Sequence, residues 1–253
     1  MTARSRLATI LWLQGYPDQA LSTAQRGVEE ALALNHAVTL CNALAQGACP
    51  VAFLTGDLAA AERFVAMLLD SSERHGLAFW QADGRCFRGV LSIKRGDTVR
   101  GLDMLRGTLD ELSKAPVHTR HDVFLGELAE ALGRAGRVAE GFATIDRALD
   151  RPEATEGLWY IAELLRIKGE IVVQAGAPNA AAEELFRQSI DWARRQDALS
   201  WELRSAMSLA RLHHRQARTT QARRVLAPVY RQFTEGFKTA DLLAAKALLD
   251  TLR

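Results

Sequence analysis

The sequence predicts an all-α fold: a right-handed α-solenoid of about six stacked helix pairs, followed by a helix that caps the last pair. The main observation is a repeat with a period of about 40 residues. Its mark is a turn residue that recurs at separations of 41, 40, 40, 40 and 41 positions, at Gly15, Gly56, Gly96, Gly136, Gly176 and Ala217. A fixed period of about 20 to 50 residues is typical of proteins in which each repeat packs on its neighbours.

Small residues recur at two fixed distances from these marks. Seven positions before the mark stand Ala8, Cys49, Gly89, Ala129, Gly169 and Ala210. Five positions after it stand Ala20, Ala61, Gly101, Gly141, Ala181 and Ala222. Two helices approach closely only where neither carries bulk, so these positions predict a close crossing of two antiparallel helices in each repeat.

Each repeat is predicted to contain two helices separated by the turn residue. In chain order the pairs cover residues 3–14 and 18–34, 36–54 and 57–75, 77–95 and 97–113, 121–135 and 138–149, 158–175 and 179–196, and 199–216 and 219–234, with a capping helix over 239–252. Pro17 suits a helix start, where its missing N–H would be unpaired anyway. Asp57 is a good N-cap. Pro50 lies inside a predicted helix and is expected to kink it.

The unbroken period predicts one superhelical domain over residues 1–253. The loosest junction is residues 114–119, which contain Pro116, and it is a candidate hinge. The first repeat begins almost at Met1 without a cap, and an uncapped repeat exposes an apolar face. We therefore expect this end to contact another chain, such as a second copy of this one, or the rest of a longer protein.

Composition predicts a soluble protein of the cytoplasm. The chain has 253 residues, of which 48% are hydrophobic and 25% charged, and its three cysteines do not make a disulfide framework. No apolar run is judged long enough to span a bilayer, and the N-terminus lacks the layout of a signal peptide. A net charge of +2 indicates no particular class of partner.

Motifs of catalysis, phosphate binding and metal binding do not occur in the sequence, so we predict a non-catalytic protein without a metal or cofactor. His213 and His214 point about 100° apart on a helix and cannot share a metal unaided. His118 and His121 are better spaced, but an exposed junction explains them equally well. Residues 187–231 contain ten arginines against three acids, yet they lack interleaved stacking aromatics, which disfavours nucleic-acid binding.

The repeats resemble the tetratricopeptide repeat, which also has a small residue in its first helix, a glycine turn and an alanine early in its second helix, although that repeat is shorter, about 34 residues. Segments of this chain go further: residues 159–170, 185–196 and 199–204, with 233–242, resemble the C-terminal tetratricopeptide-like region of large bacterial signalling ATPases. In that family the N-terminal output domain is an adenylate/guanylate cyclase or a winged-helix DNA-binding domain. The resemblance implies a regulatory region and leaves the output domain open.

Register predicts which side chains face a concave groove between the first helices of successive repeats. The positions 13, 10 and 6 before each mark are charged at the C-terminal end of the chain, and the candidate partner-binding residues are Glu130, Glu163, Arg166, Glu170, Arg204, Met207 and Arg211. Such a surface suits the charged groups of a peptide. The alternative is a ladder of weak surface ion pairs that supports stacking and binds nothing.

Two functions remain open from the sequence. The first is a protein-interaction or regulatory module that binds a peptide or protein in this groove. The second is a small-molecule sensor with a pocket between repeats near Trp159 and Trp201. Trp80, Tyr160 and Trp201 stand sixteen positions before their marks, and such recurrence favours packing in the core over a ligand cage. A closed cavity would favour the sensor, and an open groove would favour the peptide binder.

Overall fold

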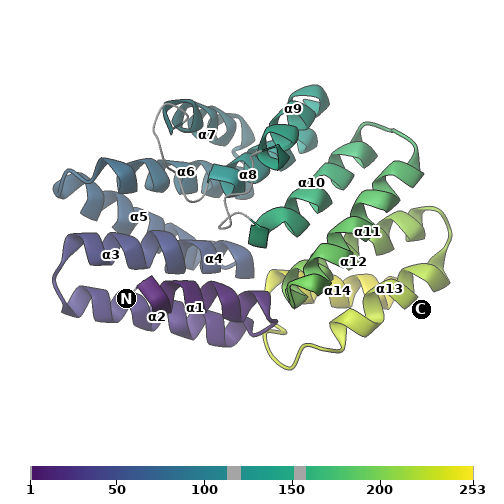
Figure 1. The fold of residues 1–253 in the computed structure, drawn as a ribbon, viewed down its shortest axis with the longest axis horizontal. Coiled ribbons are helices and arrows are strands. Elements are labelled where there is room, and N and C mark those ends of the chain that lie inside the picture. Colours follow the sequence, from purple (N-terminus) through teal and green to yellow (C-terminus); the bar gives the residue numbers. More distant parts are fainter. Residues whose placement is uncertain (1, 113–120, 151–157, 253) are drawn as a thin grey trace. The chain divides into compact units, whose positions relative to one another are not determined.

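The computed structural model describes residues 2–112, 121–150 and 158–252. These residues form helices joined by short turns, and no strand occurs among them (Figure 1). The all-α prediction is confirmed, and the helices pack against their neighbours in chain order, as in a helical repeat. The candidate hinge at residues 114–119 lies outside the described residues.

The chain divides into two compact units. The first unit runs to Leu112 and includes Glu235–Ala240, and the second comprises Ser113–Thr234 and Asp241–Arg253. The helices of the first unit are α1 (Thr2–Leu13), α2 (Pro17–Ala33), α3 (Ala37–Ala43), the π-helical turn η1 (Leu44–Ala48), α4 (Cys49–Thr55), α5 (Leu58–Arg74), α6 (Ala78–Lys94) and α7 (Thr98–Leu112). Those of the second are α8 (His121–Arg134), α9 (Val138–Leu149), the 3₁₀ turn η2 (Leu158–Tyr160), α10 (Ile161–Gln174), α11 (Asn179–Arg195), α12 (Leu199–Arg215), α13 (Thr219–Tyr230) and α14 (Ala240–Thr251).

All six repeat marks are turns in the left-handed backbone region. Their φ angles are positive, from 59° at Ala217 to 94° at Gly96. Glycine adopts this conformation without steric cost, which is why it ends the first helix of most repeats. The period in the sequence therefore records a geometric requirement.

Ala217 is the one mark that is not glycine, and an L side chain in this conformation costs about 1–2 kcal/mol. Replacing Ala217→Gly is expected to raise the free energy of unfolding by about 0.5–1 kcal/mol, because part of this gain is lost to the entropy of the unfolded chain. The reverse change, Gly136→Ala, introduces a Cβ with no atom within 4 Å and should lower stability by a similar amount through φ alone. Chemical denaturation measures both, and shifts of the same sign would contradict the explanation.

The predicted close crossing is present between α6 and α7 and between α8 and α9. A Cβ at Gly101 would lie 2.7 Å from the Gly89 carbonyl oxygen, and a Cβ at Gly141 would lie 3.3 Å from the Ala129 carbonyl oxygen. Eleven of the twelve small residues are buried.

The exception is Ala181, which is exposed, while the next residue, Ala182, is fully buried. The second helix of this repeat begins at Asn179, three residues after Gly176 instead of two, because Ala177 and Pro178 extend the turn. The prediction at Ala181 was therefore wrong by one residue.

Pro50 is accommodated by a local change of helix type. The π-helical turn Leu44–Ala48 lies immediately before the α4 residues that contain Pro50. A proline cannot donate to the carbonyl four residues earlier, and a π turn rearranges the hydrogen bonds around that gap.

The helix that contains Pro50 is also unusually apolar. Its 19 residues, Ala37–Thr55, are long and apolar enough to cross a membrane by length and composition, so the statement that no run reaches this length was wrong. In the structure 61% of its most apolar window is buried, and the helix packs against α1, α2 and α5. Packing in the interior of the first unit therefore explains why this helix is so apolar.

The first helix leaves apolar surface uncovered in the described part of the chain. The side chains of Leu7 and Ile10 on α1 are 47% and 46% exposed. The start of α2 is covered instead by the segment Glu235–Ala240: the Gly236 amide donates to Asp18 (2.9 Å), and Gln19 donates to Glu235. Contact of α1 with another chain stays a prediction.

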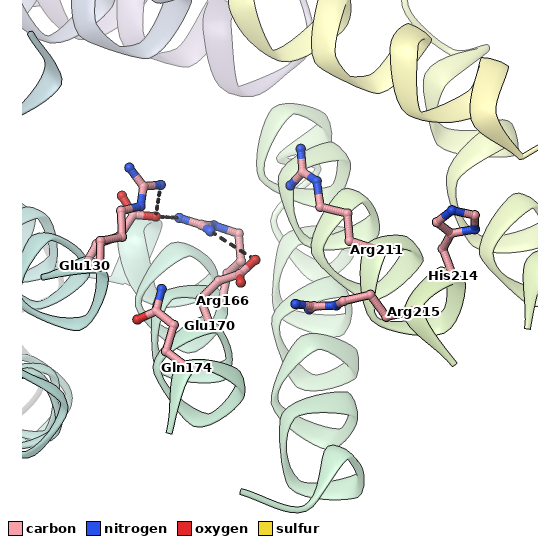
Figure 2. Close-up of a pocket in the computed structure, with 8 residues that line it drawn as sticks. Glu130, Arg166, Glu170, Gln174, Arg211, His214 and Arg215 are labelled. Atoms are coloured by element: carbon pink, nitrogen blue, oxygen red, sulfur yellow. Dashed lines mark hydrogen bonds and ion pairs between the residues drawn. The ribbon is translucent and has the colours of Figure 1, made fainter. Parts of the chain in front are cut away.

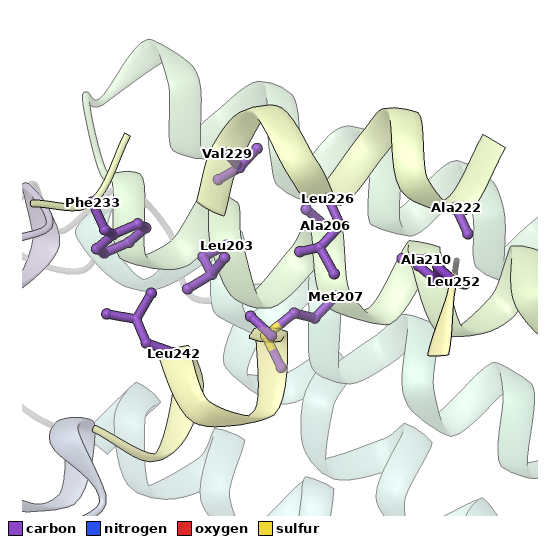
Figure 3. Packing of buried hydrophobic residues seen from close by; sticks show 11 residues of the cluster. Leu203, Ala206, Met207, Ala210, Ala222, Leu226, Val229, Phe233, Leu242 and Leu252 are labelled. Atoms are coloured by element: carbon purple, nitrogen blue, oxygen red, sulfur yellow. The ribbon is translucent and has the colours of Figure 1, made fainter. Parts of the chain in front are cut away.

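The last helix covers the final repeat as expected. Leu242 and Ala245 of α14, with Leu252 directly after it, pack into a buried cluster with residues of α12 and α13 (Figure 3). Met207, which the register placed in the groove, belongs to this cluster and is 4% exposed. The prediction that Met207 faces a partner was wrong, because α14 covers that side of α12.

Candidate functional site

The charged residues singled out by the register lie on α8, α10 and α12, the first helices of three successive pairs. Helix α10 packs against both α8 and α12. Side chains spaced by three and four along each helix project from one face, so neighbouring helices bring their charged stripes together. All of these residues belong to the second unit.

An open pocket lies among these helices. Its volume is about 370 Å³, and its lining residues are Glu130, Arg134, Arg166, Glu170, Gln174, Arg211, His214 and Arg215 (Figure 2). Four of the seven predicted groove residues line it: Glu130, Arg166, Glu170 and Arg211. The size falls within the range of about 300–1,000 Å³ that is usual for ligand sites.

One wall of the pocket rests on a buried ion-pair network formed by Glu130, Glu163, Arg166, Arg204 and Asp241. Arg166 donates to both carboxylate oxygens of Glu163 (2.7 and 2.9 Å) and to Glu130 (2.8 Å). Arg204 donates to Glu163 (3.1 Å) and to Asp241 of α14 (2.7 Å). Glu163 and Arg204 therefore do not line the pocket. They hold α10, α12 and α14 together beneath it.

The network is shielded from water. Glu163 is 3% exposed and Arg166 is 8% exposed. Burial alone would raise the pKa of Glu163, but the charges of Arg166 and Arg204 outweigh it and the pKa is lowered. Burial likewise opposes the charge of Arg166, yet Glu163 and Glu130 raise its pKa well above the usual value. Both groups are therefore ionised at neutral pH.

The alternative prediction was a ladder of weak ion pairs on the surface. It is correct that the charged side chains pair with each other, but it is wrong that these pairs are exposed. The charges do pair between neighbouring helices, but a surface pair contributes only about 0–1 kcal/mol, whereas removing one partner of a buried pair leaves an uncompensated charge. Arg166 is thus held in place by its own ion pairs, and a role in partner binding stays a prediction.

The other wall is formed by Arg211, His214 and Arg215 of α12. Arg215 projects from α12 toward the wall that carries Glu170 and Gln174, and Arg211 lines the same pocket one turn earlier on this helix (Figure 2). Neither arginine makes a hydrogen bond or ion pair within the described part of the chain. Loss of water in the pocket lowers the pKa of Arg211, and the nearby charge of Glu170 only partly opposes this.

Sequence reasoning missed four lining residues: Arg134, Gln174, His214 and Arg215. Arg215 lies four positions after Arg211 and Arg134 four after Glu130, so each continues a stripe that was already identified. The register was read only as far as six positions before the mark, and the helices extend beyond that point.

The tryptophans near the alternative sensor site pack against each other. Trp201 is fully buried, its ring lies 6.2 Å from that of Trp159, and its Nε1–H donates to the Trp159 carbonyl (3.0 Å). Tyr160 packs edge-on against Trp201. Tyr160 and Trp201 lie in the core, as the recurrence at one offset predicted, whereas Trp80, at the same offset, is only partly buried.

Among the described residues, no group of three or more His, Cys, Asp and Glu side chains could hold a metal ion. His118 lies outside the described residues. His213 is buried, while the adjacent His214 is exposed at the pocket.

The fold and site thus define an all-helical protein of consecutive helix pairs with a charged pocket in its second unit. No family model matches the chain. An uncharacterised protein of Rhizobium meliloti (strain 1021) is 23% identical over 207 residues, which cover 82% of this chain. The chain spans about a fifth of the length of this curated relative, since the match covers 20% of it.

Proposed function

We propose that this chain is a non-catalytic interaction and regulatory module, of the tetratricopeptide-like kind found in bacterial signalling ATPases, and that its pocket binds a peptide or a segment of a protein. The observation that carries the proposal is the pocket itself: it is open, and Arg211 and Arg215 reach into it without partners in the described part of the chain. The match to a fifth of a bacterial protein supports a region that works within a longer chain.

The finer architecture belongs to the same proposal. A right-handed solenoid of about six tetratricopeptide-like pairs is supported by the six left-handed turns at a period near 40 and by the small residues at the helix crossings. In such a module, binding energy at the pocket biases the position of the domains attached to it. The packing of Trp159 against Trp201 gives no support to the small-molecule sensor.

A random peptide library displayed against the whole chain tests this function. We expect the chain to select peptides, and the double variant Arg211→Ala/Arg215→Ala to bind them at least about tenfold more weakly, because charged contacts at a pocket are lost. Both arginines are exposed, so the variant should fold normally.

The matched control is Arg223→Ala/Arg224→Ala, which removes the same charge from exposed positions of α13 outside the pocket lining. It should leave binding unchanged. Equal losses in the two double variants would indicate a nonspecific effect of charge, and failure to select any peptide would overturn the proposed function.

A further inference from the structure

We infer that the pocket recognises the carboxylates of acidic side chains in the bound peptide. The inference rests on the proposed function and specifies its ligand chemistry. Arg211 and Arg215 are the residues that bind these carboxylates. Arg166 and its carboxylate partners form the opposite wall, which their own ion pairs hold in place.

Helix α12 carries two positive charges close together. Arg211 and Arg215 are four residues apart, and like charges at this spacing lie one turn apart on the same face and repel each other. No acidic side chain of the described residues pairs with either one. A bound anion between them would remove this repulsion and would supply the hydrogen-bond acceptors that both guanidinium groups lack.

The acidic side chains of the pocket already have partners within the chain. Glu130 accepts from Arg166 (2.8 Å) and pairs with Arg134 (3.1 Å). Glu170 accepts from the Ser208 hydroxyl (2.6 Å). Glu170 also lies 3.9 Å from Arg166, and its charge only partly offsets that of Arg211. The lining thus carries four arginines against two acids. The pocket therefore has an excess of positive charge, which a negatively charged ligand would balance.

Either a carboxylate or a phosphate of the ligand could supply the negative charge. A dianionic phosphate would be attracted by Arg211 and Arg215, and repelled by Glu130 and Glu170, about twice as strongly as a single carboxylate, so charge alone does not choose between them. One planar carboxylate matches the fork of each guanidinium group. We therefore assign the pocket to aspartate and glutamate side chains, one for each arginine, and a comparison with phosphoserine tests this choice.

Arg215 has one competing explanation. It is the last residue of α12, where the helix dipole stabilises a positive charge without any ligand. Arg211 lies a full turn earlier, where this effect is weak, and it makes no ion pair with an acid of the described residues. The two arginines should therefore act together in binding, and neither should matter much for folding.

Three matched peptide libraries test the inference. Each consists of capped heptapeptides with neutral random flanks and two central residues: glutamates, glutamines or phosphoserines. We expect the glutamate library to bind the whole chain and the glutamine library to bind about thirtyfold more weakly. The double variant Arg211→Ala/Arg215→Ala should lose the glutamate preference, whereas Arg223→Ala/Arg224→Ala should keep it.

Each other outcome has a definite meaning. Equal binding of the glutamine library by the unaltered chain would leave the peptide-binding function standing and overturn the carboxylate inference. Tighter binding of phosphoserine would overturn it in favour of a phosphate site. If none of the three libraries binds while the random library still selects peptides, the carboxylate inference fails and the proposed function stands. Glutamate preference that survives in Arg211→Ala/Arg215→Ala would place the anion site elsewhere.

Discussion

Replacing Arg166→Ala is expected to lower the free energy of unfolding by about 3–5 kcal/mol, which is the usual cost of removing one partner from a buried ion pair. Arg166 is 8% exposed and makes hydrogen bonds to Glu163 and Glu130. Without it, Glu163 retains its ion pair with Arg204 but loses the two hydrogen bonds that offset its burial, and Glu130 loses a buried partner while it retains the exposed pair with Arg134. A reversal, Arg166→Glu, would add repulsion and should be at least as damaging.

The same carboxylate provides a matched control. Arg134 also pairs with Glu130, at 3.1 Å, but its side chain is 63% exposed. Arg134→Ala should therefore cost about 1 kcal/mol or less. Urea denaturation of the two variants, with circular dichroism as the readout, measures the difference. If Arg166→Ala costs no more than Arg134→Ala, the buried network does not stabilise the second unit in the way described.

The network also predicts the effect of acid. The pKa of Glu163 is lowered in the folded state from its ordinary value of 4.5, so its ionised form is favoured by folding. This stabilisation is complete above about pH 4.5 and is lost as the pH falls through the lowered pKa. In Arg166→Ala the lowering should shrink or reverse, so less stability remains to be lost in acid. Denaturation curves between about pH 2 and pH 6 compare the two proteins.

The helices and turns could be predicted from the sequence because local geometry leaves a mark at each repeat. A left-handed turn favours glycine at Gly136 and at all but one of its equivalents, and a close crossing favours a small residue at Gly101 or Ala129. These requirements act within one helix pair and do not depend on what lies further along the chain. One inserted turn residue before Asn179 was enough to shift the pattern to Ala182.

The burial of the charged side chains could not be predicted from the sequence in the same way. Spacing places Glu163 and Arg166 on one face of a helix, but it does not say what covers that face. Here Arg204 and Asp241 close over Glu163 from α12 and α14. The same covering helix moved Met207 from an expected surface into the core. Burial depends on packing between distant segments, and the register alone cannot report it.

The second large effect is expected at Gly101, where α7 crosses α6. An added Cβ would lie 2.6 Å from the Cγ1 atom of Ile93, 2.7 Å from the Gly89 carbonyl oxygen and 2.8 Å from the backbone nitrogen of Ile93. Two of these atoms belong to the backbone of α6, so no side-chain rotation relieves the contact. Gly101→Ala must push the two helices apart, and we expect it to cost about 2–3 kcal/mol.

Gly107, on the same helix, is the control that separates packing from helix propensity. It is exposed, and an added Cβ would meet no atom within 4 Å. Gly107→Ala should therefore stabilise the chain by about 0.5–1 kcal/mol, the ordinary gain from alanine in a helix. Gly101→Ala has the same gain in propensity but is expected to destabilise, so thermal unfolding should move in opposite directions. Stabilisation by both changes would show that α6 and α7 do not need glycine at their crossing, and the seam that repeats along the chain would lose its physical basis.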